Sequence, residues 1–191
     1  MDVRQMQAVL TPPDPQLADE LIVLEPLHAT HVPAMRALGD DDDVARFTLL
    51  TSPLDHESAR EWVERYAAGW GEGTLGGFAV VSADEGAFLG FIGIVRYDAA
   101  GKTAELGYIV APEARGRGVA TRALGLLTTW CLDALGLERV ELRIDPANLP
   151  SLRLAEKLGY VHEGVLRSMP FKDGLRADLA VYSRIPADGR G

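Results

Sequence analysis

The residues with the clearest chemical potential form the segment Arg115-Gly116-Arg117-Gly118, which lies between an apolar run and a helical pattern. A glycine-rich turn before a helix presents free backbone N–H groups, and the positive end of the helix dipole favours an anion. Glycine has no Cβ, so a phosphate can approach the backbone closely. Arg122 adds a third positive charge nearby, although the chain has a formal net charge of −9. The segment therefore predicts a phosphate-binding turn.

Three other interpretations of this turn compete. A nucleoside-triphosphate loop would need GxxxxGK followed by Ser or Thr, and that pattern is absent from the sequence. The dinucleotide fingerprint of an oxidoreductase would need Gly or Ala where Thr121 stands, in an early parallel βαβ unit. The turn could also be a solvated Arg/Gly loop without a ligand, because short motifs often occur by chance.

Alternating strand and helix patterns must position this turn, and they predict one α+β domain. We expect a mixed, mostly antiparallel central sheet of about six to seven strands, flanked by about four helices. Residues 1–20, with three prolines in "TPPDP", are expected to be a loose leader, 21–186 the domain and 187–191 a tail. The expected strands are 21–27, 78–83, 87–97, 103–110, 139–144, 160–168 and 177–185, and the expected helices are 28–39, 52–70, 116–135 and 149–159.

Bulk properties exclude several classes of protein. A chain of 191 residues with 47% hydrophobic residues suits one buried core. The acidic balance disfavours nucleic acid, which must be bound by neutralising phosphates. The single cysteine, Cys131, lies in an apolar helical pattern and is expected to be buried. No signal peptide or membrane span is visible, so we expect a cytoplasmic protein, and the four histidines show no metal-binding pattern with cysteine, so we expect no metal.

Two ordered motifs resemble the GNAT superfamily of N-acetyltransferases. Arg115-Gly116-Arg117-Gly118-Val119-Ala120 resembles the acyl-CoA motif of that family: Gln or Arg, two residues, Gly, one residue, then Gly or Ala. Downstream, "NLPSLRLAEKLGY" at 148–160 resembles the next helix of the family. Glu163-Gly164 and the closing strands resemble the branch of ribosomal-protein serine/alanine N-terminal acetyltransferases. The resemblance covers roughly residues 20–186.

The resemblance implies acetyl-CoA as co-substrate and assigns the residues that would hold it. Backbone groups of Ile109 and Val110 would pair with the pantetheine arm as an added strand would. Asn148 would bond the pantetheine near the thioester, although it could equally be a helix N-cap. The backbone N–H groups that would hold the pyrophosphate belong to Gly116, Arg117, Gly118, Val119, Ala120 and Thr121.

The resemblance also implies direct attack of an amine on the thioester, with three catalytic candidates. Glu105 and Glu141, on neighbouring strands, could each take the proton of the ammonium, or could be solvated strand residues. Ser151 could hydrogen-bond the leaving thiolate, or could cap the helix. The sequence departs from the family at Ala155, where many members carry an acidic tyrosine, and at Pro170, where the ribosomal-protein branch carries its base.

The acceptor implied by the resemblance is a primary amine, either a protein N-terminus or a small molecule, and the protein is expected to be a homodimer. Residues 28–70 should build the acceptor pocket. The acidic run 40–43 could attract a cation there, or be a solvated loop. Trp62, Tyr66 and Trp70 could line the pocket, or pack in the core. A non-catalytic module that binds acyl-CoA or a metabolite on the same fold is the alternative function, motivated by Ala155.

Overall fold

A computed structural model describes residues 10–189 and contains one eight-stranded sheet in that part of the chain. The strand order is β1-β2-β3-β4-β5-β6-β8-β7, and every pair is antiparallel except β5 with β6. The α+β class is therefore confirmed, with one more strand than the largest expected number. The strands are β1 (Leu17–Ala18), β2 (Ile22–Pro26), β3 (Gly76–Ser82), β4 (Phe88–Asp98), β5 (Thr103–Val110), β6 (Arg139–Ile144), β7 (Val161–Pro170) and β8 (Arg176–Arg184).

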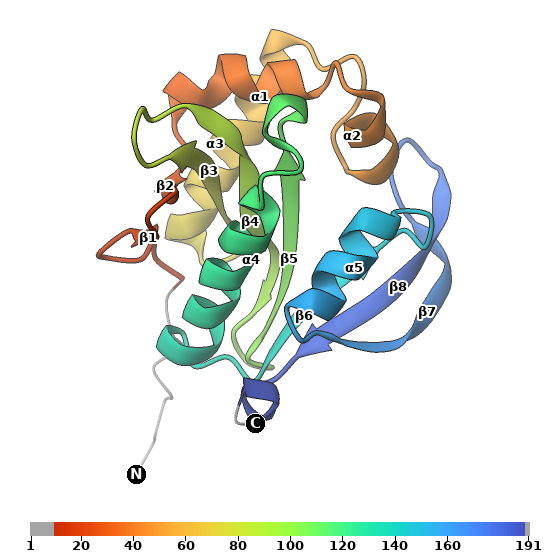
Figure 1. Ribbon diagram of the computed structural model, residues 1–191. Helices are drawn as coiled ribbons and strands as arrows, with labels where there is room; N and C mark the ends of the chain where they lie inside the picture. The colour runs from red at the N-terminus through yellow and green to blue at the C-terminus, as the bar shows by residue number, and fades with distance from the viewer. Residues whose placement is uncertain (1–9, 190–191) are drawn as a thin grey trace.

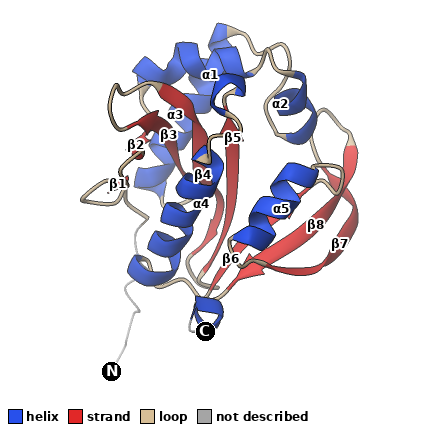
Figure 2. Cartoon of the chain, in the orientation of Figure 1, coloured by secondary structure: helices blue, strands red, loops and turns tan. Residues whose placement is uncertain are grey.

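Residues 10–189 contain five α-helices, one more than the expected four (Figure 1). They are α1 (Val32–Leu38), α2 (Asp42–Phe47), α3 (His56–Glu72), α4 (Val119–Thr129) and α5 (Leu149–Lys157). Helices α4 and α5 lie on one face of the sheet and α1 and α3 lie on the other (Figure 2). A π-helical turn, Trp130–Ala134, extends α4 and buries Cys131, and burial raises the pKa of this thiol.

Strand β6 shows how the sequence pattern produces this layering. Val140, Leu142 and Ile144 alternate with Arg139, Glu141 and Arg143, and successive strand side chains point to opposite faces. The three apolar side chains are buried, while the charged ones are partly exposed on the opposite face. One face of β6 thus joins the core and the other carries ionisable groups.

The parallel contact between β5 and β6 is short, and this opens the sheet. The register pairs Thr103 with Arg139, Ala104 with Val140 and Glu105 with Glu141, and it ends there. Beyond this point the strands diverge, as Figure 1 shows between the labels β5 and β6. The divergence exposes the edge of β5 beside the N-terminus of α4 and the start of α5.

Several element boundaries differ from the sequence-based expectations. Strand β1 lies within the expected leader, and Leu10 is fully buried, so this segment packs on the domain. Helix α4 begins at Val119 and not at 116, because Gly116 and Gly118 adopt positive φ and form the preceding turn. In the acidic run at 40–43, Asp42 and Asp43 start α2, Asp41 is its N-cap and Asp40 lies in the preceding turn. A short 3-10 turn, Pro186–Gly189, begins at the last residue of the expected domain and extends into the expected tail.

No helix between residues 10 and 189 is both long enough and apolar enough to cross a membrane.

Candidate active site

The turn before α4 has the geometry of an anion cradle. Gly116 and Gly118 have φ values of 73° and 79°, in the left-handed region, and a Cβ on either residue would meet no atom within 4 Å. Gly118 is the N-cap of α4, and no side chain caps this helix. The first backbone N–H groups of α4, including those of Val119, Ala120 and Thr121, are therefore available to a bound anion. A pyrophosphate fits these observations.

The charges around the cradle differ from the sequence-based expectation of a local positive charge from three arginines. Arg115 forms two hydrogen bonds with Asp41, of 2.7 and 3.1 Å. Arg122 donates to Asp19 and to Glu20, both at 2.7 Å. Two of the three charges are thus neutralised by carboxylates far away in the sequence. Arg117 lies in the exposed turn itself and is the arginine best placed to meet an anion there.

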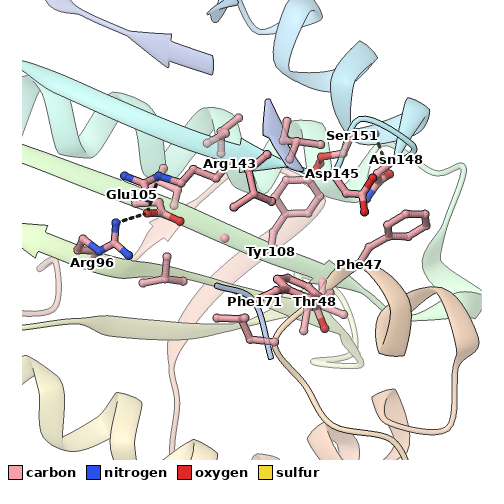
Figure 3. Close-up of a pocket in the computed structure, with 18 of the residues that line it drawn as sticks. Phe47, Thr48, Arg96, Glu105, Tyr108, Arg143, Asp145, Asn148, Ser151 and Phe171 are labelled. Carbon is pink, nitrogen blue, oxygen red and sulfur yellow. Dashed lines mark hydrogen bonds and ion pairs between the residues drawn. The ribbon is translucent and has the colours of Figure 1, made fainter. Parts of the chain in front are cut away.

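A cavity of about 380 Å³ opens where β5 and β6 diverge. Strands β4, β5 and β6 form its floor, while α2, α3 and the β7–β8 connection form its sides (Figure 3). Among the predicted residues, it brings together Glu105, Ile109, Asn148 and Ser151. The other polar lining residues are Thr48, Arg96, Tyr108, Arg143 and Asp145.

Glu105 lies on the cavity floor between two arginines. Its Oε2 is 3.1 Å from Arg96 Nη1 and 3.2 Å from Arg143 Nε, and its side chain is 16% exposed. These contacts are ion pairs without aligned hydrogen bonds, and Oε2 itself is buried. Burial raises the pKa of Glu105 above its usual range, and the two arginines oppose this shift. A carboxylate with a raised pKa in a cavity is a candidate general base.

A β-bulge brings Arg96 to this carboxylate. The register of β4 and β5 pairs Ile94 with Leu106 and then Arg96 with Glu105, so Val95 is the extra residue. Without the bulge, Val95 would face Glu105 across the strands. The role of Arg96 therefore depends on the register, and no signal in the sequence indicates it.

Glu141 is the direct neighbour of Glu105 across β5 and β6, but it does not line the cavity. Its carboxylate lies 2.7 Å from Arg139 and 3.5 Å from Arg143. Arg139 also forms a double hydrogen bond with Glu163 on β7. Glu141 is thus held in a ladder of ion pairs outside the cavity, and Glu105 is the carboxylate with access to a substrate.

A pair of hydroxyl groups lies further along the cavity. Tyr108 Oη and Ser151 Oγ are 2.7 Å apart, and Asn148 Oδ1 accepts a hydrogen bond of 3.3 Å from Ser151 N–H. Asn148 is therefore an N-cap of α5 that also faces the cavity. Burial raises the pKa of Tyr108, so the phenol is protonated at neutral pH. Sequence reasoning missed Tyr108, because "LGYIV" indicates only a strand.

The edge of β5 offers backbone groups to the cavity. Ala111 N–H donates to Leu89 O at 2.9 Å, which continues the antiparallel pairing of β5 with β4. Backbone groups alternate in direction along a strand, so those of Ile109 also face β4. The N–H and C=O of Val110 and Tyr108 then face the gap towards β6. An extended ligand chain can pair with Val110, while the N–H of Ile109 is used within the sheet.

Aromatic side chains line the far side of the cavity. Trp62 and Tyr66 of α3 face it, whereas Trp70 packs in the core with its ring 5.1 Å from that of Phe78. The aromatic stripe of α3 is thus split between the cavity and the core. Phe47 and Phe171 approach the cavity from α2 and from the β7–β8 connection (Figure 3).

The acidic run 40–43 serves the structure of α2. Asp41 is the N-cap and accepts a hydrogen bond of 2.9 Å from Val44 N–H, besides pairing with Arg115. Asp42 and Asp43 fill the first turn, where carboxylates are favoured by the helix dipole. The run does not line the cavity, and three of its four residues are exposed, which is closer to the expected solvated segment than to a part of the acceptor pocket.

One group of side chains has the composition of a metal site. Ligand atoms of Glu25, His28 and His31 lie within 4.8 Å of one another. However, His31 Nδ1 accepts a hydrogen bond of 3.3 Å from His28 N–H, which places the ring proton on Nε2, 3.6 Å from Glu25. A protonated Nε2 cannot bind a metal, so this geometry favours a histidine–carboxylate pair. The absence of a metal stays a prediction.

Comparisons with known proteins agree with the fold and the cradle. A family model described as an acetyltransferase (GNAT) domain matches residues 22–161. The uncharacterized N-acetyltransferase YoaA of Bacillus subtilis strain 168 is 28% identical over 169 residues, which are 88% of this chain and 96% of YoaA. The spermidine N(1)-acetyltransferase of Escherichia coli K12 is 33% identical over 95 residues, half of each chain. A GCN5-related N-acetyltransferase from Brucella melitensis superposes with a TM-score of 0.80 at 26% identity, covering 94% of this chain and 82% of the other.

The family model spans most of the described chain, including β5, the glycine cradle and α5. The resemblance of the two motifs is thereby confirmed, as are the enzyme class and acetyl-CoA as the co-substrate. The chain belongs to the GNAT family of acetyltransferases.

Proposed function

We propose that the protein transfers an acetyl group from acetyl-CoA to the primary amine of an acceptor that enters the cavity beside α2 and α3. One observation carries this proposal: a carboxylate with a raised pKa, Glu105, and a protonated hydroxyl pair, Tyr108 and Ser151, line the same cavity. Transfer to an amine requires a base for the ammonium and a proton donor for the thiolate. The cavity supplies both.

Different residues of the cavity carry the proton transfers and the stabilisation of charge. When bound, acetyl-CoA supplies an acetyl thioester at the gap between β5 and β6. Glu105 takes the proton that the ammonium loses, directly or through one water, and frees the nitrogen lone pair to form the new C–N bond. The N–H of Val110 is the free strand donor for the carbonyl oxygen as it gains charge. Ser151 would supply a proton to the sulfur as the C–S bond breaks, with Tyr108 donating in turn to Ser151. The second proton, which the nitrogen loses as the amide forms, would restore the Tyr108 phenol.

The charges in the cavity favour an acceptor with one amine. The ionisable lining residues are Arg96, Glu105, Arg143 and Asp145, whose formal charges cancel. Glu105 is already paired with two arginines, and Asp145 accepts a hydrogen bond of 2.7 Å from Ala147 N–H. A polyamine would need several unpaired carboxylates. A protein N-terminal α-amine, or a small molecule with one amine, fits better than the substrate named for the spermidine acetyltransferase.

Ligand binding is the first test of this function. Acetyl-CoA and CoA should raise the melting temperature, because each binds the native state, while NAD and ATP should not. An equal shift with ATP would mean that the cradle selects phosphates without selecting CoA. No shift with any of the four compounds would remove the basis of the proposal.

Amine acetylation is the second test, with a matched pair of carboxylate variants. Peptides with N-terminal Ser or Ala, simple monoamines and spermidine are incubated with acetyl-CoA, and products are detected by mass spectrometry. Glu105→Gln should lower kcat by about a hundredfold, as expected for loss of a general base, whereas Glu141→Gln should change it less than about threefold. A preference for spermidine over the monoamines and peptides would contradict the proposed acceptor. Equal losses of kcat in the two variants would contradict the proposed base.

The homodimer, expected from the resemblance, and the cytoplasmic location, expected from the sequence, stay predictions.

A further inference from the structure

Two segments far apart in the sequence form the side of the cavity opposite Ser151. Phe47, Thr48 and Leu49 come from the end of α2, and Met169, Pro170 and Phe171 come from the end of β7. Figure 1 shows α2 beside the turn that joins β7 and β8. An acceptor that enters from this side must pass between the two segments, so the gap between them limits its size.

Lys172 joins the two segments. Its Nζ donates to the backbone oxygen of Leu50 at 2.7 Å and to that of Ala45. Thr48 N–H bonds to Val44 O, so Ala45 lies in the last turn, where a helix leaves carbonyl groups without helical partners. Lys172 thus binds the carbonyl end of α2, where a positive charge is also favoured by the helix dipole. The lysine is half-buried, and burial lowers its pKa.

Helix α2 depends on ties of this kind. It has six residues, too few for a helix that is stable by itself, and no other described helix or strand packs extensively against it. Its N-terminus is held by the hydrogen bonds between Asp41 and Arg115. Its C-terminus is held by Lys172. Loss of either tie should leave the wall that carries Phe47 free to move.

We propose that Lys172 is a positioning residue for the acceptor: by holding α2 against the β7–β8 turn, it sets the width of the acceptor side of the cavity. The inference rests on the proposed function, because it assigns this side of the cavity to the amine. It adds a residue outside the cavity lining that controls which amines fit. The cofactor side, formed by β5, the cradle and α5, has no contact with Lys172 among those recorded for the described chain.

The test uses Lys172→Met and a control, Lys157→Met, which removes the same charge from an exposed position in the last turn of α5. Hydrogen exchange of residues 44–50 measures the tie directly and needs no substrate. Loss of one or two charge-assisted hydrogen bonds predicts exchange about ten- to a hundredfold faster in Lys172→Met and unchanged in Lys157→Met. Lys172→Arg, which keeps the charge and the donors, should lie between wild type and Lys172→Met.

Kinetics then separate positioning from general stability. In Lys172→Met, the KM of the amine should rise about tenfold, the KM of acetyl-CoA should stay within twofold, and bulkier amines should gain relative to small ones. Unchanged hydrogen exchange at residues 44–50 in Lys172→Met would show that Lys172 does not hold α2. Faster exchange with equal changes in both KM values would overturn the acceptor role. If wild type acetylates no amine, the proposed function and the acceptor role both fail, and the exchange data alone then decide whether Lys172 holds α2.

Discussion

Replacing Gly118 by Ala tests the anion cradle most directly. Gly118 has a φ of 79° and caps α4. A Cβ there would touch no protein atom within 4 Å, so the substitution causes no clash. The backbone conformation alone should cost about 1–2 kcal/mol in the free protein, because L-residues disfavour the left-handed region. For a chain of this length the melting temperature should fall by roughly 2–8 °C.

The effect on ligand binding is separate from this strain. The added methyl group projects from a turn at which a pyrophosphate must approach the backbone, and we expect acetyl-CoA to bind at least tenfold more weakly. At a ligand concentration about 100 times the wild-type Kd, binding stabilises the wild type by about 2.7 kcal/mol and a tenfold weaker variant by about 1.4 kcal/mol. The ligand-induced rise in melting temperature should then fall from about 5–10 °C to about 3–6 °C.

Gly136 provides the matched control. It has a φ of 66°, and a Cβ there would also meet no atom within 4 Å, but it follows the π-helical turn at the other end of α4. Gly136→Ala should therefore carry a similar strain and keep the full shift with acetyl-CoA, measured by differential scanning fluorimetry. Equal ligand shifts in the two variants would refute the assignment of the cradle.

Three further predictions concern other parts of the molecule. Tyr108→Phe should lower kcat about ten- to a hundredfold and leave the stabilisation by acetyl-CoA unchanged; an unchanged kcat would mean that Ser151 needs no partner. Arg139 lowers the pKa of Glu163 from 4.5 to about 2. Because the folded pKa lies below the unfolded one, this pair stabilises the fold above about pH 4.5 and loses its effect as the pH falls towards 2. Since Glu163 is 41% exposed, Glu163→Gln should cost only about 1 kcal/mol at pH 7 in urea unfolding, and a difference that persists at pH 2 would contradict the pairing. Cys131, buried with a raised pKa, should react with a thiol reagent only as fast as the protein unfolds; rapid labelling of the native protein would contradict its burial.

The elements with a strong local signal were predictable. Strand β6 matches its expected range because "RVELRI" alternates strictly, and Asn148 caps α5 as its position before Pro150 suggested. Gly116 and Gly118 mark the cradle because glycine tolerates positive φ. These features depend on residues close together in the chain, so a single sequence contains the information.

The positions of charges were not predictable in the same way. Arg115 and Arg122 were expected to add positive charge at the turn, but each pairs with a carboxylate more than seventy residues away in the chain. The sequence could not tell which of Glu105 and Glu141 lines the cavity, since both are carboxylates on neighbouring strands. The limited pairing of β5 with β6 opens the cavity that Glu105 lines, and the bulge at Val95 places Arg96 beside Glu105. Glu141 lies outside the cavity, in a ladder of ion pairs.

The sequence by itself determined the fold class, the family and the glycine turn before α4, because backbone preference, alternation and motif spacing are local properties. Only the tertiary structure decided which side chains meet. The contacts of Tyr108 with Ser151, of Arg115 with Asp41 and of Lys172 with Leu50 join residues that are 43, 74 and 122 positions apart. Such contacts depend on strand register and on the divergence of β5 from β6, which the whole packed chain sets and no short segment specifies.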